Sequence, residues 1–247
     1  MAADGRRHVL AIGGTGGQPT LGTGGTPLLL SYAVGLVGRA APSICVINTA
    51  SADDPAAYLR MYEMLCPVAG RLSRLALFPM PTVNDPADLL MSQDLIVVGG
   101  GSVANMLAVW RAHGLDTVMR EAWQAGIVLS GVSAGAICWF EGGTTDSFGP
   151  ELRPFTAGLG LLAGSYCPHY DSEPRRRPLY QALVAGRSLP AGLACDDGAA
   201  AHLVDDALAE IVADRPGALG YRVEGADGRA AEAPLPTRLL GQGHAEP

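Results

Sequence analysis

The first half of the chain repeats one pattern, in which a short apolar run ends in glycine or a small polar residue and an amphipathic stretch follows. The apolar runs, rich in Val, Ile and Leu, lie at 8–12, 43–48, 74–78, 94–98 and 127–132. The stretches with helical spacing lie at 27–37, 55–68, 102–113 and 115–125, and a further helix is expected after position 133. Short apolar strands that alternate with helices predict an α/β fold with a mostly parallel sheet covered by helices on both faces.

The second half is patterned differently. Shorter runs at 191–194, 199–204 and 207–213 are separated by Asp and Gly, and 220–224 has the same character. This spacing predicts short antiparallel strands near the C-terminus, packed as a mixed sheet edge on the same core. Without a clear linker or internal repeat, residues 1–247 are expected to form a single α/β domain, and the polar segment 241–247 to be a frayed tail.

Composition excludes several classes of protein. Apolar residues make up 48% of the sequence and charged residues 17%, which is typical of a compact globule. The formal charge of −7 is opposite to the basic balance of a nucleic-acid binder, so no nucleic-acid partner is expected. The sequence contains no Lys, which excludes a Walker A loop, a Schiff-base enzyme and a Ser–Lys dyad.

Cysteine usage and the N-terminus point to the cytoplasm. The five Cys are odd in number and form no C-x-x-C pair, so they are interpreted as buried free thiols and not as a disulfide framework or a zinc site: Cys45, Cys66, Cys138, Cys167 and Cys195. The apolar run after Arg6 and Arg7 is too short for a signal peptide, and no stretch is long enough to span a membrane. A cytoplasmic protein without a membrane partner is therefore expected.

The strongest chemical signal is Gly131-Val132-Ser133-Ala134-Gly135, which follows an expected strand and opens an expected helix. In that context G-x-S-x-G is a nucleophile elbow, and its small residues let the chain make a tight, strained turn around the serine. Ser133 is therefore the candidate nucleophile. The Ala134 N–H at the helix start is the natural first donor to an oxyanion.

A serine nucleophile needs a base, and the chain has five histidines. His8 begins the first strand at its far end, His113 ends a helix, His202 lies inside a short strand and His244 lies in the tail. By elimination His169, which follows an apolar run in a position typical of a strand-end loop, is the candidate base. The carboxylate that would orient it stays open among five residues: Asp146, Asp171, Glu173, Asp196 and Asp197.

Two glycine runs end strands at the same sheet edge. The run 99–101 is a candidate second oxyanion donor, because glycine lets backbone N–H groups approach a ligand closely. The run that begins at Gly13-Gly14 resembles a dinucleotide loop at first, but Pro19 stands where the third glycine of G-x-G-x-x-G would fall when counted from Gly14. Nucleotide binding is therefore disfavoured.

At these residues the chain resembles the family of serine peptidases that contains aspartyl dipeptidase (peptidase E) and cyanophycinase, over about 8–223. The shared marks are the glycine run at 99–101, the S-A-G-A elbow at 133–136, Pro168-His169 and the stretch 193–199. The resemblance implies a class I glutamine-amidotransferase-like fold. It also implies Ser133 as nucleophile and His169 as base, without a metal or an organic cofactor.

The resemblance also implies the remaining site residues. The family's triad acid, a Glu in the dipeptidase, aligns with Asp197, with Asp196 as the near alternative. A second acid after the elbow matches Asp146, and the arginine that binds the substrate's Asp side chain falls near Arg175, with Arg176 and Arg177 as alternatives. Gly100, Gly101 and Ala134 are then the expected oxyanion donors.

The expected activity is hydrolysis of dipeptides or short peptides with N-terminal Asp, by a monomer or homodimer. Three alternatives stay open. A cyanophycinase-like enzyme would cleave β-aspartyl bonds. An α/β-hydrolase esterase uses the same elbow, but with the chain order Ser, Asp, His. A non-catalytic amidotransferase-like binding protein would keep the fold without turnover.

Overall fold

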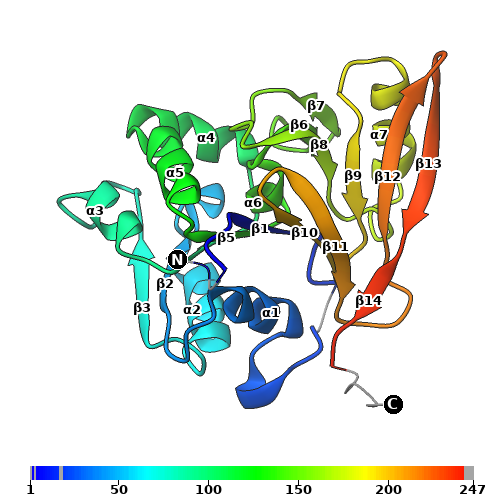
Figure 1. Cartoon of the computed structure of the whole chain (residues 1–247). Coiled ribbons are helices and arrows are strands. Elements are labelled where there is room, and N and C mark those ends of the chain that lie inside the picture. Colours follow the sequence, from blue (N-terminus) through cyan, green and yellow to red (C-terminus); the bar gives the residue numbers. More distant parts are fainter. Residues whose placement is uncertain (1, 3, 17–18, 242–247) are drawn as a thin grey trace, which may run out of the picture.

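The computed structural model describes residue 2, residues 4–16 and residues 19–241. Figure 1 shows strands flanked by helices, with the C-terminal strands on the opposite side of the molecule from β3. The strands are β1 (His8–Ile12), β2 (Ser43–Ile47), β3 (Arg71–Leu75), β4 (Leu95–Val98), β5 (Val128–Val132), β6 (Phe140–Thr145), β7 (Arg153–Phe155), β8 (Leu162–Cys167), β9 (Gly192–Cys195), β10 (Ala199–Val204), β11 (Ala207–Ala213), β12 (Gly220–Ala226), β13 (Arg229–Leu235) and β14 (Thr237–Leu239). The α-helices are α1 (Leu28–Val37), α2 (Pro55–Leu65), α3 (Pro86–Met91), α4 (Val103–Ala112), α5 (Leu115–Gln124), α6 (Ala134–Ile137) and α7 (Arg176–Ala185).

The larger sheet has the order β14-β11-β10-β1-β5-β4-β2-β3. Every neighbouring pair from β1 to β3 in this order is parallel, as the alternation of strands and helices predicts. Beyond β1 the sheet is mixed, because β10 is antiparallel to both β1 and β11. The carboxyl ends of β1, β5 and β4 therefore meet at one edge, where ligands bind in sheets of this kind.

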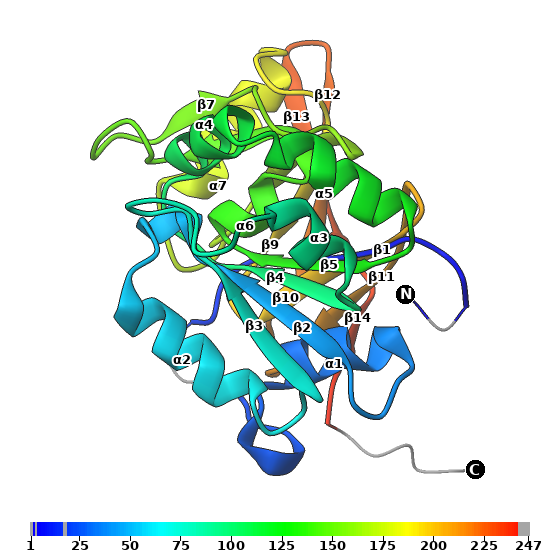
Figure 2. The same cartoon turned by 90° about the vertical axis from the view of Figure 1, so that its left-hand side faces the viewer.

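Helices cover both faces of this sheet, because successive side chains of a strand point to opposite sides. Leu10 and Ile12 of β1 pack in a cluster with residues of α1 and α2, whereas Val9 and Ala11 pack in a second cluster with residues of α4 and α5. Figure 2 shows α1 and α2 on one side of the strands and α3, α4 and α5 on the other. The runs of buried apolar residues are thus explained by burial on both faces.

A second, six-stranded sheet has the order β13-β12-β9-β8-β6-β7. The prediction that the C-terminal strands form a mixed edge of the sheet is confirmed for β10 and β11, whereas β9 and β12 pair with each other in the second sheet. Between β9 and β10 the chain turns at Gly198, which has a φ of 78°. A strand's alternation of side chains shows that it has a buried face, but it does not identify the strand it pairs with.

The cysteines are free, but Cys66 is exposed while the other four are buried. No helix within residues 4–16 and 19–241 combines the length and apolar character needed to cross a membrane. Of the tail predicted at 241–247, residues 242–247 lie outside the described part of the chain.

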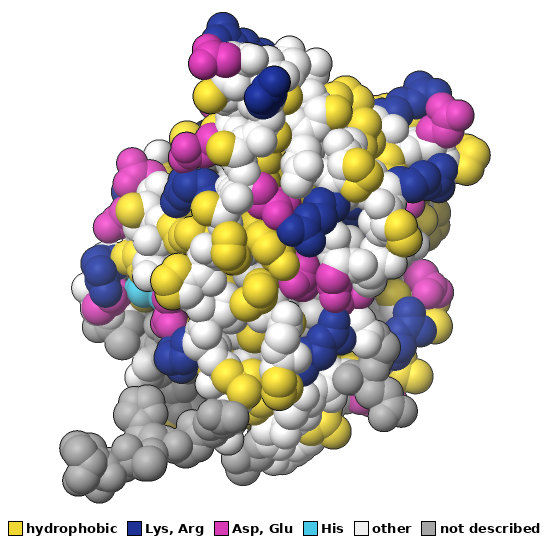
Figure 3. Space-filling model, turned by 90° about the vertical axis from the view of Figure 1, so that its right-hand side faces the viewer, with side chains coloured by type: hydrophobic (Ala, Val, Ile, Leu, Met, Phe, Trp, Pro, Cys, Tyr) yellow, Lys and Arg dark blue, Asp and Glu magenta, His cyan; other side chains and the backbone are white. Residues whose placement is uncertain are grey.

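Charged side chains of both signs lie close together on the face that Figure 3 shows, on the side of β12 and β13. Arg177 of α7 pairs with Glu232 of β13, and its guanidinium lies 4.9 Å from the ring centroid of Tyr221. Arg238 of β14 pairs with Glu210 of β11 at 2.8 Å. Partly exposed pairs of this kind contribute roughly 1 kcal/mol or less to stability, and they connect α7 with β13 and β14 with β11.

Candidate active site

Ser133 lies between β5 and α6, as the elbow motif predicts, although α6 has only four residues. Its backbone has a φ of 55° and a ψ of −113°, a conformation that a residue with a side chain rarely adopts. A Cβ atom on Gly131 would overlap with the backbone of Gly135, and one on Gly135 would overlap with the backbone of Val98. The glycines on both sides of Ser133 are therefore required by close packing of the turn.

His169 follows β8 and brings its ring to Ser133. Its Nε2 atom lies 2.9 Å from Ser133 Oγ. The backbone of His169 also has a positive φ, 53°, and its N–H donates to Gly13 O at 3.3 Å. A tight turn after β8 thus directs the ring toward the carboxyl ends of β1 and β5, which places the predicted base at the predicted nucleophile.

Asp197 is the carboxylate that meets His169, with 2.6 Å between His169 Nδ1 and Asp197 Oδ1. Burial would raise the pKa of Asp197, but hydrogen bonds from His169 and Ser172 outweigh it and hold this pKa below its usual value. Asp197 therefore stays ionised at neutral pH, and it favours the tautomer of His169 that carries the proton on Nδ1 and leaves Nε2 to accept from Ser133.

The neighbouring Asp196 points elsewhere. Its Oδ2 accepts from Leu219 N at 3.0 Å and from the Tyr221 hydroxyl at 3.4 Å, and burial raises the pKa of its carboxyl. Neither described contact is with His169. The two adjacent acids, which the sequence could not separate, therefore have different surroundings.

Three further residues support Asp197, and the sequence reasoning assigned none of them this position. Asp171 Oδ1 accepts from the Asp197 N–H at 2.8 Å, and Arg215 contacts Asp171 Oδ2 at 3.4 Å and Gly16 O at 3.1 Å. Gly14 lies against both members of the pair, because a Cβ atom there would overlap with the His169 ring and with Asp197 Oδ1. The glycine run after β1 thus packs against the His169–Asp197 pair. The sequence signal for this role is that the run ends a strand at the same sheet edge as Ser133.

The predicted oxyanion donors separate into two groups. Ala134 follows Ser133 at the start of α6, where backbone N–H groups have no partner inside the helix. A Cβ atom on Gly100 would lie 3.4 Å from Ser133 Cβ and 3.9 Å from Ser133 Oγ, so Gly100 faces the serine. Gly101, with a φ of 135°, instead packs its α-carbon against the backbone of Ala50.

Arg175 and Asp146 line one cavity of about 200 Å³, together with Ser172 and Glu173. Ser172 also contributes a hydrogen bond that lowers the pKa of Asp197, so this cavity adjoins the histidine–carboxylate pair. Arg175 is exposed, and its guanidinium donates to a backbone carbonyl, Pro150 O, at 3.2 Å.

The two other arginines of the run are engaged with acidic partners. Buried Arg176 donates to Glu173 at 2.7 Å and to Thr144 O at 2.9 Å. Arg177 pairs with Glu232. Within the described chain Arg175 has no carboxylate partner, which distinguishes it from the alternatives that the sequence left open.

The remaining described histidines are accounted for elsewhere. His8 Nδ1 lies 3.0 Å from His202 Nε2, and His202 Nδ1 lies 2.7 Å from the Tyr32 hydroxyl. His113 is the C-terminal cap of α4, and His244 lies outside the described residues. The elimination that selected His169 is consistent with these positions.

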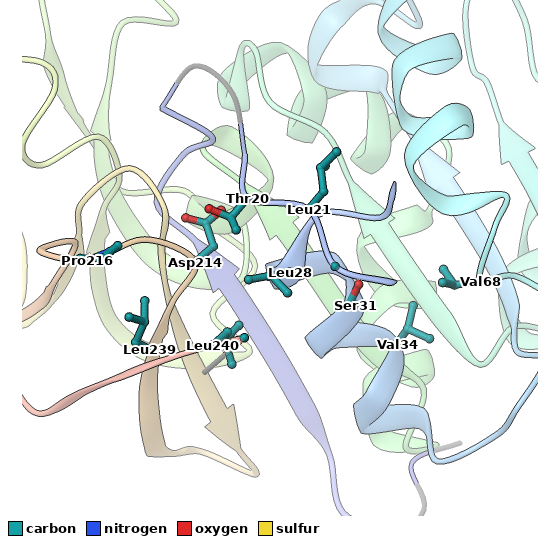
Figure 4. A pocket seen from close by; sticks show the side chains of 12 residues that line it. Thr20, Leu21, Leu28, Ser31, Val34, Val68, Asp214, Pro216, Leu239 and Leu240 are labelled. Carbon is teal, nitrogen blue, oxygen red and sulfur yellow. The ribbon is translucent and has the colours of Figure 1, made fainter. Parts of the chain in front are cut away.

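A cavity of about 740 Å³ lies apart from Ser133, between the segment that precedes α1 and the ends of β11 and β14 (Figure 4). Mostly apolar side chains line it, with Asp214 at one side: among them are Leu21, Leu28, Val34, Leu239 and Leu240. None of Ser133, His169 and Asp197 lines this cavity, so its size alone does not make it the reaction site.

Comparisons with known proteins show the family of this chain. The model of peptidase family S51 matches residues 15–211, a range that includes Ser133, His169 and Asp197. The uncharacterized peptidase YgaJ of Bacillus subtilis (strain 168) is 46% identical over 203 residues, which cover 82% of this chain and 87% of that protein.

Solved structures share the fold at low sequence identity. A peptidase from an acI-B1 actinobacterium superimposes with a TM-score of 0.65 at 15% identity, over 93% of this chain and 95% of that one. A peptidase E candidate from Listeria monocytogenes EGD-e superimposes with a TM-score of 0.55 at 16% identity, over 82% of this chain and 96% of that one. From the family match and the 46% identical relative, the chain belongs to peptidase family S51 and is a serine-type peptidase.

Proposed function

We propose that this peptidase hydrolyses dipeptides or short peptides with an N-terminal Asp, through a triad of Ser133, His169 and Asp197. The observation that carries the proposal is the pair of short contacts on the two nitrogens of His169, 2.9 Å to Ser133 Oγ and 2.6 Å to Asp197 Oδ1. A serine, an imidazole and a carboxylate in this order form the unit that activates a hydroxyl for attack on a carbonyl.

The reaction follows from these contacts. His169 Nε2 takes the hydroxyl proton as Ser133 Oγ forms a bond to the scissile carbonyl carbon. Asp197 stabilises the resulting imidazolium without taking its proton. His169 then gives the proton to the leaving amine as the C–N bond breaks. Water, deprotonated by His169, attacks the acyl-enzyme and releases the acid product and the serine.

The negative charge that develops on the carbonyl oxygen needs donors on one side of Ser133. The N–H groups of Ala134 and Gly100 are the proposed donors, because Ala134 follows Ser133 at the start of α6 and Gly100 faces the serine without a side chain. Gly101 contributes by allowing the turn at a φ of 135°, where a side chain would be strained and would overlap with Ala50.

Preference for N-terminal Asp is proposed from the cavity that Arg175 and Asp146 share. A guanidinium binds a carboxylate through two parallel hydrogen bonds, so Arg175 is suited to the Asp side chain. Asp146 is suited to the α-ammonium group, which only the first residue of a peptide carries. Together they would favour a short peptide that begins with Asp.

The test compares wild type with Ser133→Ala on Asp-Leu, Glu-Leu, Ala-Leu, a β-aspartyl dipeptide and a p-nitrophenyl ester, with free amino acid and nitrophenol as readouts. We expect cleavage of Asp-Leu that falls at least about 1,000-fold in Ser133→Ala. Cleavage of the β-aspartyl peptide alone would replace the proposal with a β-aspartyl peptidase. Hydrolysis of the ester alone, or no hydrolysis by folded protein, would contradict it.

A further inference from the structure

A second cavity adjoins Ser133 on the side of Gly100. Its volume is about 370 Å³, within the range of pockets that bind small molecules. Gly100 and Val132, which lies directly before the serine, both line it. A Cβ atom on Gly100 would lie 3.9 Å from Ser133 Oγ, so Gly100 adjoins both this cavity and the nucleophile.

This cavity differs in position and lining from the one that holds Arg175 and Asp146. The Arg175 cavity is built by the segments that follow β6 and β8, whereas this one is built by the segments that follow β1, β2 and β4 and by α2. No residue lines both cavities. A substrate whose first residue enters the Arg175 cavity therefore has a separate space available for the residue after the scissile bond.

One wall of this cavity is a face of α2. Ala57, Met61 and Met64 line it at the spacing i, i+4, i+7, which places them along one side of the helix. Both methionines are only partly buried, and they pack on the apolar cluster beneath. Methionine is flexible and polarizable, so this wall is suited to an apolar side chain of variable shape.

A positively charged side chain also lines this cavity. Arg60 lines it, is exposed, and has no hydrogen bond or ion pair within residues 4–16 and 19–241. The acid that shares the cavity, Asp54, is occupied as the cap of α2, where it accepts from the N–H groups of Ala56 and Ala57 at 3.2 and 3.1 Å. Arg60 is thus the cation in this cavity that is available to pair with an anionic group of a ligand.

The inner end of the cavity contains an unsatisfied donor. Asn48 lines the cavity and is buried, and its Nδ2 has no hydrogen-bond partner in the described part of the chain. A buried donor without a partner is destabilising by about 1–3 kcal/mol, and an acceptor on a ligand would relieve that penalty after a small turn of the amide. An oxygen atom of a ligand in this cavity would supply the acceptor that Asn48 Nδ2 lacks.

From these observations, and resting on the proposed function, we infer that the cavity lined by Asn48, Arg60, Met61 and Met64 binds the residue on the carboxyl side of the scissile bond. Met61 and Met64 contact an apolar side chain. Arg60 pairs with the terminal carboxylate of a dipeptide, and Asn48 Nδ2 donates to an oxygen of the same residue. The peptidase would then measure substrate length, because only a dipeptide presents a carboxylate at this distance from the bond.

The experiment measures binding without turnover. Asp-Leu, its C-terminal amide and Asp-Gly are titrated by calorimetry into Ser133→Ala, alone and combined with Arg60→Gln, Met61→Ala or Arg222→Gln. Arg222 is an exposed arginine of β12, in the second sheet, and serves as the matched control. Thermal melting verifies that each variant is folded.

We expect Ser133→Ala to bind Asp-Leu about 10-fold more tightly than its amide. With Arg60→Gln the two peptides should bind equally, whereas Arg222→Gln should leave a difference of about the same size. Met61→Ala should weaken Asp-Leu several-fold more than Asp-Gly. The inference is overturned by equal binding of Asp-Leu and its amide, by a ratio that survives Arg60→Gln, or by no binding of either peptide at 10 mM.

Hydrolysis of aspartyl-p-nitroanilide by the wild type tests the proposed function separately, because this substrate has no carboxylate to meet Arg60. If the anilide is cleaved but Arg60 does not make Asp-Leu bind more tightly than its amide, the inference is wrong and the proposed function stands. If Arg60 makes Asp-Leu bind more tightly than its amide but no aspartyl substrate is hydrolysed, the binding site stands and the proposed activity is wrong.

Discussion

A side chain on Gly14 would occupy the space of Asp197 Oδ1. The backbone is tied down here as well, since Gly14 O accepts from Gly198 N at 2.8 Å. Gly14→Ala should therefore displace Asp197 or His169 and lower kcat at least about 100-fold while the protein stays folded, since a shift of about 1 Å at a reacting group is enough for such a loss.

Gly35→Ala is the matched control for Gly14→Ala. Gly35 lies inside α1, is exposed, and has no atom within 4 Å of the position a Cβ would take. The same substitution there should leave kcat unchanged and raise stability by roughly 0.5–1 kcal/mol, measured by urea unfolding. Equal activity of Gly14→Ala and wild type would contradict the prediction that a side chain at this position displaces Asp197 or His169.

Replacement of each of the two adjacent acids by Asn should lower activity to very different extents. Asp197→Asn removes the charge that opposes the imidazolium and favours the wrong tautomer, so kcat/KM for Asp-Leu should fall about 1,000-fold or more. Asp196→Asn keeps an acceptor for Leu219 N, so the loss should stay below about 10-fold. A larger loss for Asp196→Asn than for Asp197→Asn would reverse the assignment of the triad acid.

Asp171 should act by positioning Asp197 through the hydrogen bond from the Asp197 N–H. Asp171→Ala leaves that N–H without its acceptor, and kcat should fall about 10-fold with little change in KM. Asp171→Asn retains a side-chain oxygen and should restore most of the activity. If the two variants lost activity equally, the charge of Asp171 and its contact with Arg215 would matter more than the hydrogen bond.

Arg175 and Arg177 should differ in what their replacement changes: substrate binding for Arg175 and stability for Arg177. Arg175→Gln should raise KM for Asp-Leu about 10-fold or more and leave KM for Ala-Leu unchanged, because it removes the proposed carboxylate partner. Arg177→Gln breaks a pair with Glu232 and should lower the melting temperature without changing the preference for Asp. A preference that survives Arg175→Gln would exclude Arg175 as the determinant.

Stability should fall as the pH drops from 7 toward 4, partly through His202. Burial, followed by the electrostatic effect of neighbouring His8, lowers the pKa of His202 from 6.5 to about 4, while Glu210 acts in the opposite direction. Below pH 6.5 the unfolded chain takes up a proton that the folded chain refuses until about pH 4. The free energy of unfolding should therefore fall by roughly 3 kcal/mol over this interval.

The contribution of His202 is measured as a difference between two pH series of urea unfolding. His202→Leu should remove this part of the pH dependence, whatever its effect on stability at pH 7. The carboxylates of the chain give both proteins the same remaining slope. Identical slopes in the variant and in the wild type between pH 6.5 and 4.5 would show that His202 does not titrate in this way.

The local features of the site could be read from the sequence. The elbow at Ser133 depends on its neighbours, since Gly131 and Gly135 permit a turn that larger residues would prevent. The strands β1, β2, β4 and β5 were predictable because burial on both faces requires continuous apolar runs, whereas β3, with the sequence RLSRL, lies three residues before its predicted start. His169 could be selected because few histidines were available.

The distances that make these residues a site depended on the tertiary structure. Asp196 and Asp197 are equally acidic in the sequence, and only the turn between β9 and β10, with Gly198 at a φ of 78°, directs Asp197 to His169 and Asp196 to Leu219. The sequence by itself thus determined which strands are buried and where the chain makes a strained turn, because both depend on near neighbours. Which carboxylate meets the imidazole, and which strands form a second sheet, were decided by pairing between segments far apart in the chain, and local patterns carry no information about such partners.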